Sequence, residues 1–151
     1  MIQESTIERV LDRLEAGGED YAQELQDFAE AQPHLVAYLT NEEHALLTEE
    51  EQALLLFGAL VIYEAVNDQL VAPAAVPEFA IGEAEERNFA LLPEKGNFRD
   101  RLTPLFADSE EEELLAFAED LLVPEEDGSG PGKEAREPIF IALKTTVDVL
   151  T

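Results

Sequence analysis

The sequence predicts an all-α fold: a single-domain bundle of six or seven helices around one buried central helix at about residues 49–70. Three observations predict this class. Apolar residues recur at three- and four-residue spacing along most of the chain, as they do on the buried face of a helix. Capping and helix-breaking residues fall at the ends of these stretches. One stretch is apolar on nearly every side, so the other helices have to surround it.

The N-terminal part of the chain has the pattern of three amphipathic helices. Ser5 and Glu8 have the spacing of a capping box, which predicts that the first helix begins there. Gly17 and Gly18 end it, because glycine adopts the left-handed conformation that commonly follows a helix. Two further helices are expected over about 20–31 and from Pro33 to about 47, the second with a break near Asn41.

The central helix is the most clearly marked element of the sequence. Thr48 and Glu51 form a second capping box at its start. Residues 53–66 are then apolar almost throughout, which is typical of a helix that neighbours cover on all sides. Gly58 lies inside this run, where glycine costs about 1 kcal/mol relative to alanine. We therefore expect a close helix crossing at Gly58.

The C-terminal half alternates irregular segments with helices. An irregular connection is expected over 71–82, because Pro73 and Pro77 exclude a continuous helix, and a flexible glycine-rich loop is expected over 124–133. The helices are expected over 83–92, 98–106 (disturbed by Pro104), 109–122 and from Pro138 to the end. The β-branched run 145–149 leaves a terminal strand as the alternative for the last of these.

Composition indicates a soluble protein of the cytoplasm. A hydrophobic content of 46% is sufficient for a folded core, so the high charge does not imply disorder. The absence of cysteine fits a reducing compartment and excludes disulfides and thiolate chemistry. The first residues mix acids with apolar side chains, unlike a signal peptide. The longest apolar run, 53–63, is about half the length of a membrane span, so no membrane association is expected.

The charge balance is strongly acidic. Nine Lys and Arg residues stand against 35 Asp and Glu residues, for a net charge of −26. Such a surface repels phosphate groups, so nucleic acid is not an expected partner. Three explanations of the acidity compete: simple solubility, adaptation to a salty cytoplasm, and mimicry of nucleic acid. Composition alone does not choose among them.

No recognisable motif assigns chemistry to this chain. A di-metal carboxylate site needs Glu three residues before His, but Ala31 precedes His34 at that spacing and Asn41 precedes His44. The sequence also lacks a nucleophile elbow, a phosphate-binding loop and a dinucleotide-binding fingerprint. We therefore expect no metal, no cofactor and no catalytic residues of a recognised type.

Two groups of residues are candidate binding sites. The first contains four of the nine basic residues, with the apolar side chains of Phe89 and Phe98 beside them: Arg87, Lys95, Arg99 and Arg101. They form either a contact for an anion or a partner, or a set of cations that neutralise neighbouring acidic helices. The second is Tyr63 and Asn67, which share one face at the polar end of the central helix and either line a cleft or finish a buried helix at the surface.

These features favour a non-enzymatic protein that binds or regulates other proteins. The alternative is a small enzyme built from scattered carboxylates and the Arg87–Arg101 cations. Mimicry of nucleic acid is the third hypothesis. The expected partner is another protein or a second copy of this chain, since periodicity does not separate a core from an interface.

Overall fold

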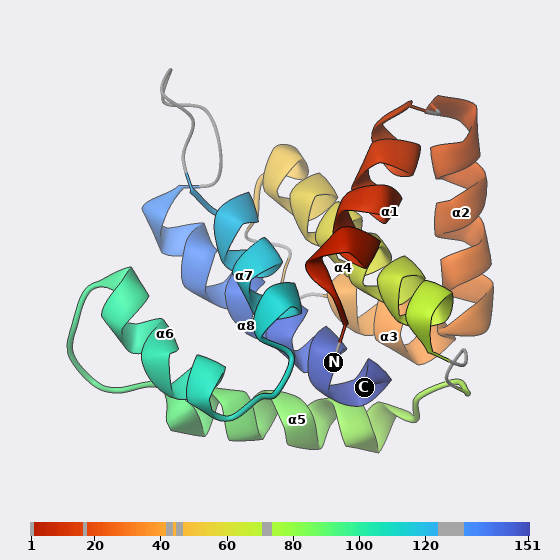
Figure 1. The fold of residues 1–151 in the computed structure, drawn as a ribbon. Helices are drawn as coiled ribbons and strands as arrows, with labels where there is room; N and C mark the ends of the chain where they lie inside the picture. The colour runs from red at the N-terminus through yellow and green to blue at the C-terminus, as the bar shows by residue number, and fades with distance from the viewer. Residues whose placement is uncertain (1, 17, 42–43, 45–46, 71–73, 124–131) are drawn as a thin grey trace.

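The computed structural model describes residues 2–16, 18–41, 44, 47–70, 74–123 and 132–151. The described residues form eight helices and contain no strand, which confirms the all-helical class (Figure 1). The helices are α1 (Glu4–Ala16), α2 (Gly18–Ala31), α3 (Pro33–Leu39), α4 (Glu49–Gln69), α5 (Glu78–Leu91), α6 (Phe98–Ala107), α7 (Glu112–Leu121) and α8 (Lys133–Leu150).

α4 is the central helix that the sequence predicts. It packs against α1, α2, α7 and α8, and most of its residues from Leu55 to Val66 are buried. The capping box is present: the Thr48 side chain accepts from the Glu51 N–H, and the Glu51 carboxylate accepts from the Thr48 N–H. The same carboxylate also accepts from the Gly132 N–H at 2.8 Å, so it joins the start of α4 to the start of α8. These two backbone donors hold the pKa of Glu51 below its usual value.

α8 is a second central helix, which the sequence analysis did not anticipate. It packs against α4, α5, α6 and α7, and its residues from Ile139 to Val147 are almost fully buried. The crossing of α4 and α8 is close at Gly58, as expected. A Cβ atom added there would lie 3.0 Å from Leu143 of α8 and 2.9 Å from Leu121 of α7.

Several predicted boundaries need correction. α5 begins at Glu78, directly after Pro77, so the irregular connection expected over 71–82 is shorter than predicted. Proline precedes a helix readily because its missing N–H is not needed there, and this explains the earlier start. The loop expected over 124–133 lies mostly outside the described residues, and α8 already begins at Lys133. Pro138 is consequently an interior residue of α8.

Three other helices can be compared with their predicted extents. The C-terminal segment is helical to Leu150, so the alternative of a terminal strand is wrong. α6 continues past Pro104 to Ala107, one residue beyond its expected end. The described residues form eight helices, where six or seven were expected. α1 starts at Glu4, which places Ser5 inside the helix, where it cannot act as the cap. The Gln3 carbonyl instead accepts the first backbone hydrogen bonds, from the Thr6 and Ile7 N–H groups.

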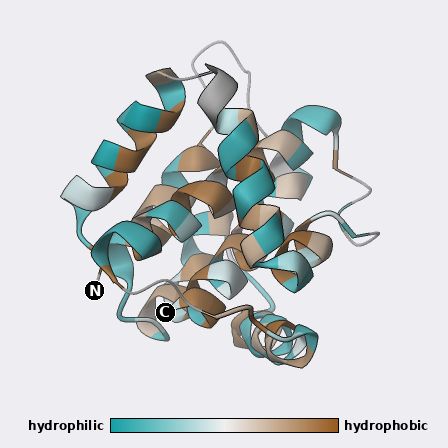
Figure 2. Ribbon diagram, turned by 90° about the vertical axis from the view of Figure 1, so that its right-hand side faces the viewer, coloured by the Kyte–Doolittle hydropathy of each residue, from teal (hydrophilic) through white to brown (hydrophobic). Residues whose placement is uncertain are grey.

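Apolar stretches gather in the interior of the bundle, and hydrophilic turns face outward (Figure 2). One continuous set of buried apolar residues includes members of all eight described helices. Within the described part of the chain, no helix is both long enough and apolar enough to span a membrane.

Candidate functional site

The four predicted basic residues do not form one patch. Arg87, on α5, pairs with Asp148 of α8 at 3.3 Å and lies 3.7 Å from Asp108 at the end of α6. Arg101, on α6, pairs with Glu137 of α8 at 2.8 Å. Both arginines therefore neutralise acids of the helices beside them, which is one of the two interpretations that the sequence left open.

The other two predicted cations are exposed. Lys95 lies in the turn between α5 and α6, and Arg99 lies in the first turn of α6. Of the two phenylalanines expected as anchors, Phe89 is 48% exposed on α5, whereas Phe98 is partly buried against the core. The predicted cluster thus separates into two internal ion pairs and two exposed cations.

A buried polar network behind Arg87 escaped the sequence analysis. Lys144 of α8 is fully buried, and its Nζ donates to Asn88 Oδ1 at 2.8 Å. The same ammonium pairs with Asp108 and Asp148, each at 2.9 Å. Asn88, also fully buried, donates its amide to Thr145 and Asp148. This α5–α6–α8 network satisfies the polar groups that the bundle buries there.

The network has a definite electrostatic consequence. The hydrogen bond from Lys144, with the charges of Lys144 and Arg87, holds the pKa of Asp108 below its usual value. The carboxylate is therefore ionised in the folded protein at neutral pH. The sequence indicates this network only weakly, because Lys144 and Asp148 have the four-residue spacing that is common to helical ion pairs.

The second predicted pair separates as well. Tyr63 is buried in the core, and its ring lies 4.7 Å from that of Phe28. Asn67, one turn later, lines a pocket between α1 and the end of α4. Its Oδ1 atom is buried and has no hydrogen-bond partner among the described residues. Tyr63 and Asn67 therefore lie one turn apart on α4, but Tyr63 is in the core and Asn67 is at a cleft.

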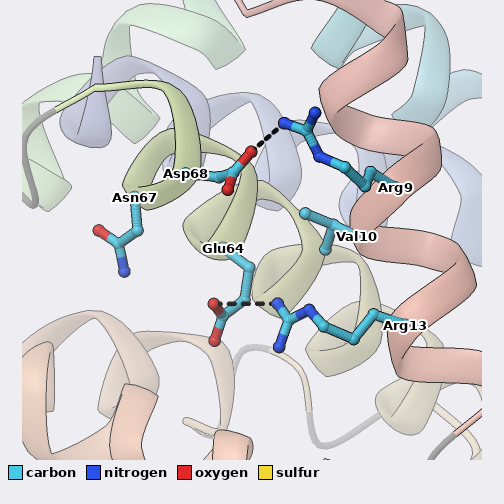
Figure 3. A pocket seen from close by; sticks show the side chains of 6 residues that line it. All are labelled: Arg9, Val10, Arg13, Glu64, Asn67 and Asp68. Carbon is cyan, nitrogen blue, oxygen red and sulfur yellow. Dashed lines mark hydrogen bonds and ion pairs between the residues drawn. The ribbon is translucent and has the colours of Figure 1, made fainter.

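This α1–α4 pocket has a volume of about 440 Å³ and is lined mainly by charged side chains. Arg9 pairs with Asp68, and Arg13 pairs with Glu64 at 3.4 Å (Figure 3). Asn67 projects away from the two arginines. Burial raises the pKa of Glu64, and the nearby Glu24 carboxylate raises it further against the opposing charge of Arg13.

A larger hollow lies along α5, and we call it the α5–α8 groove. Its volume is about 700 Å³. It is formed by the segment before α5, the first turns of α5 and the end of α8, and most of its lining side chains are small and apolar. The lining residues are Ala74, Ala75, Val76, Pro77, Ala80, Glu83, Ala84, Arg87, Asp148 and Val149. The ion pair of Arg87 with Asp148 lies in its wall, so the buried network supports one side of this groove.

The chain matches no protein-family model, no curated protein and no solved structure. Among the residues that the structure describes, no group of three or more histidine, aspartate or glutamate side chains is placed to hold a metal ion.

Proposed function

We propose that this chain is a non-enzymatic, cytoplasmic interaction or regulatory protein that binds a basic partner protein through its acidic surface. One observation supports this function above the others. Most of the basic side chains form ion pairs with acids of the same molecule, so the acidic residues that greatly outnumber them are left to define its outer surface.

The ion pairs that carry this observation involve five of the nine basic residues. They are Arg9 with Asp68, Arg13 with Glu24 and Glu64, Arg87 with Asp108 and Asp148, Arg101 with Glu137, and Lys144 with Asp108 and Asp148. Moreover, no lysine or arginine occurs in the sequence between Arg13 and Arg87. α2 and α4 therefore have no cation of their own, and their exposed carboxylates include Asp27, Glu30, Glu49 and Glu50.

A surface of this kind attracts basic proteins over long distances. Complementary charge raises the rate of encounter and suppresses wrong partners, and salt screens the effect. We therefore expect the interaction to weaken as ionic strength rises.

The experiment is recovery of partners from the native lysate by the tagged protein, at low and at high salt. We expect a basic protein that is retained at low salt and lost at high salt. The variant Asp27→Lys with Glu30→Lys reverses exposed charges on α2 and is expected to lower the recovery. The control, Lys95→Gln with Arg99→Gln, removes exposed cations and is expected to preserve it. Recovery of no partner at low salt contradicts the proposal.

The same experiment addresses mimicry of nucleic acid. If the recovered partner binds DNA, and added DNA displaces it from this protein, the acidic surface acts in place of phosphates. A partner that DNA does not displace supports ordinary protein recognition.

One specific observation favours the enzymatic alternative. It concerns the α1–α4 pocket with Arg9 and Arg13, not the Arg87–Arg101 cations that the sequence suggested. The α1–α4 pocket combines Glu64, whose pKa is raised, with the unpartnered Asn67 oxygen. Perturbed acids in a cleft are typical of functional sites. A thermal-shift screen of small polar metabolites tests this alternative. A ligand that stabilises the native protein but not Glu64→Gln or Asn67→Ala supports a small-molecule site in this pocket.

A further inference from the structure

The α5–α8 groove has an apolar floor, and the first turn of α5 also carries an exposed aromatic side chain. Val76 and Ala84 are buried in its floor, and Val149 of α8 lines its far side. Phe79 directly precedes the lining residue Ala80 and is 69% exposed. Exposed apolar side chains and apolar hollows are typical of interaction surfaces, because both lose unfavourable contact with water when a partner covers them.

The charge around the groove is negative. Glu78 and Glu83 are exposed on the first turns of α5, and Glu83 lines the groove itself. The positive charge of Arg87 is already balanced by its ion pairs with Asp108 and Asp148. The rim therefore offers the exposed Glu83 carboxylate beside an apolar floor.

We propose that the α5–α8 groove is the docking site for a basic amphipathic segment of the partner. The segment inserts an apolar side chain against the floor beside Val76 and Ala84 and places a lysine or arginine against Glu83. This inference rests on the proposed function and specifies where the basic partner binds. Amphipathic helices are commonly recognised in this way, with apolar anchors in a groove and charges at its rim.

Charge argues against the two other classes of occupant. An acidic segment would meet the carboxylates of α5. A second copy of this chain would bring its own net charge of −26 toward the same surface, which opposes self-association. A basic segment is attracted by the whole surface as well as by the rim.

The groove is also preformed. The Arg87–Asp148 ion pair and the hydrogen bond from Lys144 to Asn88 hold the end of α8, which forms one wall, against α5, which forms the other. A rigid site loses little conformational entropy when a partner binds, so a short segment is sufficient for measurable affinity.

The test uses two fluorescein-labelled synthetic peptides of about 15 residues, a length at which an isolated helix is marginally stable. One peptide contains leucine on one face and lysine on the other. The second carries glutamine in place of leucine and the same charge. We expect the native protein at low salt to bind the leucine peptide about tenfold more tightly than the glutamine peptide, a difference of about 1.4 kcal/mol.

Matched variants locate the site on α5. Ala80→Lys and Ala90→Lys add the same charge to the same helix, but only Ala80 lines the groove. We expect Ala80→Lys to weaken binding of the leucine peptide about tenfold and Ala90→Lys to change it less than about twofold. The reason is that a few central contacts supply most of the binding energy of an interface. Glu83→Lys and Glu86→Lys form a second pair on exposed positions, where the substitution does not threaten folding. The same contrast is expected between them.

Each outcome has a defined meaning. If both variants of each pair lose the same amount of peptide affinity, the attraction comes from net charge alone. This result contradicts the groove as the docking site but is compatible with the proposed function. Equal affinity for the two peptides also overturns the groove. Binding of neither peptide at low salt overturns the proposed function itself. The native protein could also prove to be a dimer that Ala80→Lys dissociates and Ala90→Lys leaves intact. The groove would then bind a second copy of this chain, which contradicts the proposal of a basic segment.

Discussion

Lys144 and Asn88 are both fully buried, and the Lys144 ammonium donates a hydrogen bond to the Asn88 side chain at 2.8 Å. This contact joins α8 to α5, and the carboxylates of Asp108 and Asp148 surround the same ammonium. A lysine is rarely buried completely unless its charge is paired and its donors are satisfied. The pair therefore fixes how α5, α6 and α8 pack, and it supports the wall of the α5–α8 groove.

Replacing Lys144 with methionine is expected to destabilise the protein by about 2 kcal/mol, because the buried Asn88 oxygen loses its donor and only Arg87 remains to balance Asp108 and Asp148. Urea unfolding measured by circular dichroism gives this value. The double variant Lys144→Met with Asp148→Asn is expected to recover part of the loss. Arg9→Met is the control, since its ion pair with Asp68 is largely exposed and such pairs contribute less than about 1 kcal/mol. Similar losses for Lys144→Met and Arg9→Met would contradict a structural role for the network.

The contrast between α4 and this network shows how far the sequence can predict the fold. The central helix was predictable, because its apolar composition and the Thr48–Glu51 capping box are local signals. The burial of Lys144 was not, because it depends on Asn88 and Asp108, which are 56 and 36 residues away in the chain. Only tertiary packing brings these groups together.

The candidate binding residues show the same limit. Arg87 and Arg101 are close in sequence and were predicted as parts of one basic cluster, yet each pairs with a different acid of α8. Net charge within a sequence window does not define a surface patch, because side chains of successive helices leave in different directions. The α5–α8 groove was missed for a related reason: its floor joins residues 74–84 to the far end of the chain.

Asp108 is expected to make folding sensitive to acid. Its pKa is lower in the folded protein than in the unfolded chain, because Lys144 donates to the ionised carboxylate. Its stabilisation is therefore complete above the unfolded-state pKa and is lost as the pH falls through the folded-state pKa, below about pH 4. We expect Asp108→Asn to lower the urea midpoint at pH 7 and to bring it toward the native value at acid pH. A constant difference across this range would exclude the linkage.

Glu64 is expected to behave in the opposite sense. Burial raises its pKa in the folded protein, so folding favours the protonated form, and this contribution is lost as the pH rises through the folded-state pKa. We expect Glu64→Gln to raise the melting temperature at pH 7 and to leave it nearly unchanged below about pH 4, where the native carboxyl is protonated. The control is Glu49→Gln, on an exposed residue in the first turn of α4. A melting temperature that falls on substitution of Glu64 would show that its pairing with Arg13 outweighs burial.

Two glycine substitutions are expected to have opposite effects on stability. Alanine is about 1 kcal/mol more favourable than glycine within a helix. At Gly82 of α5 a Cβ atom meets no other atom within 4 Å, so Gly82→Ala is expected to stabilise the protein by about this amount. At Gly58 the same atom would lie 3.0 Å from Leu143, which is fully buried and cannot move away freely. Overpacking costs about 1–3 kcal/mol, so Gly58→Ala is expected to destabilise it. Equal stabilisation at both positions would show that the α4–α8 crossing yields easily.

Salt is expected to stabilise the folded protein at neutral pH. With a net charge of −26, the compact state is opposed by repulsion among its carboxylates. The screening length falls from about 30 Å at 0.01 M salt to about 8 Å at 0.15 M, so the urea midpoint should rise steeply over this range. Near pH 4.1 the chain has no net charge, and the same salt is expected to change the midpoint little.

The pH comparison separates screening of this charge from general salt effects on water, which would act equally at both pH values. The amount of salt required also separates two explanations of the acidity. If the protein is fully folded at 0.01 M salt and gains only modest stability, its carboxylates serve solubility and partner recognition. If folding is complete only at molar salt, far beyond the concentration that screens a charged surface, the acidity is an adaptation to a salty cytoplasm. In that case a partner held by charge alone would be screened under native conditions, and binding would depend on the apolar floor of the α5–α8 groove.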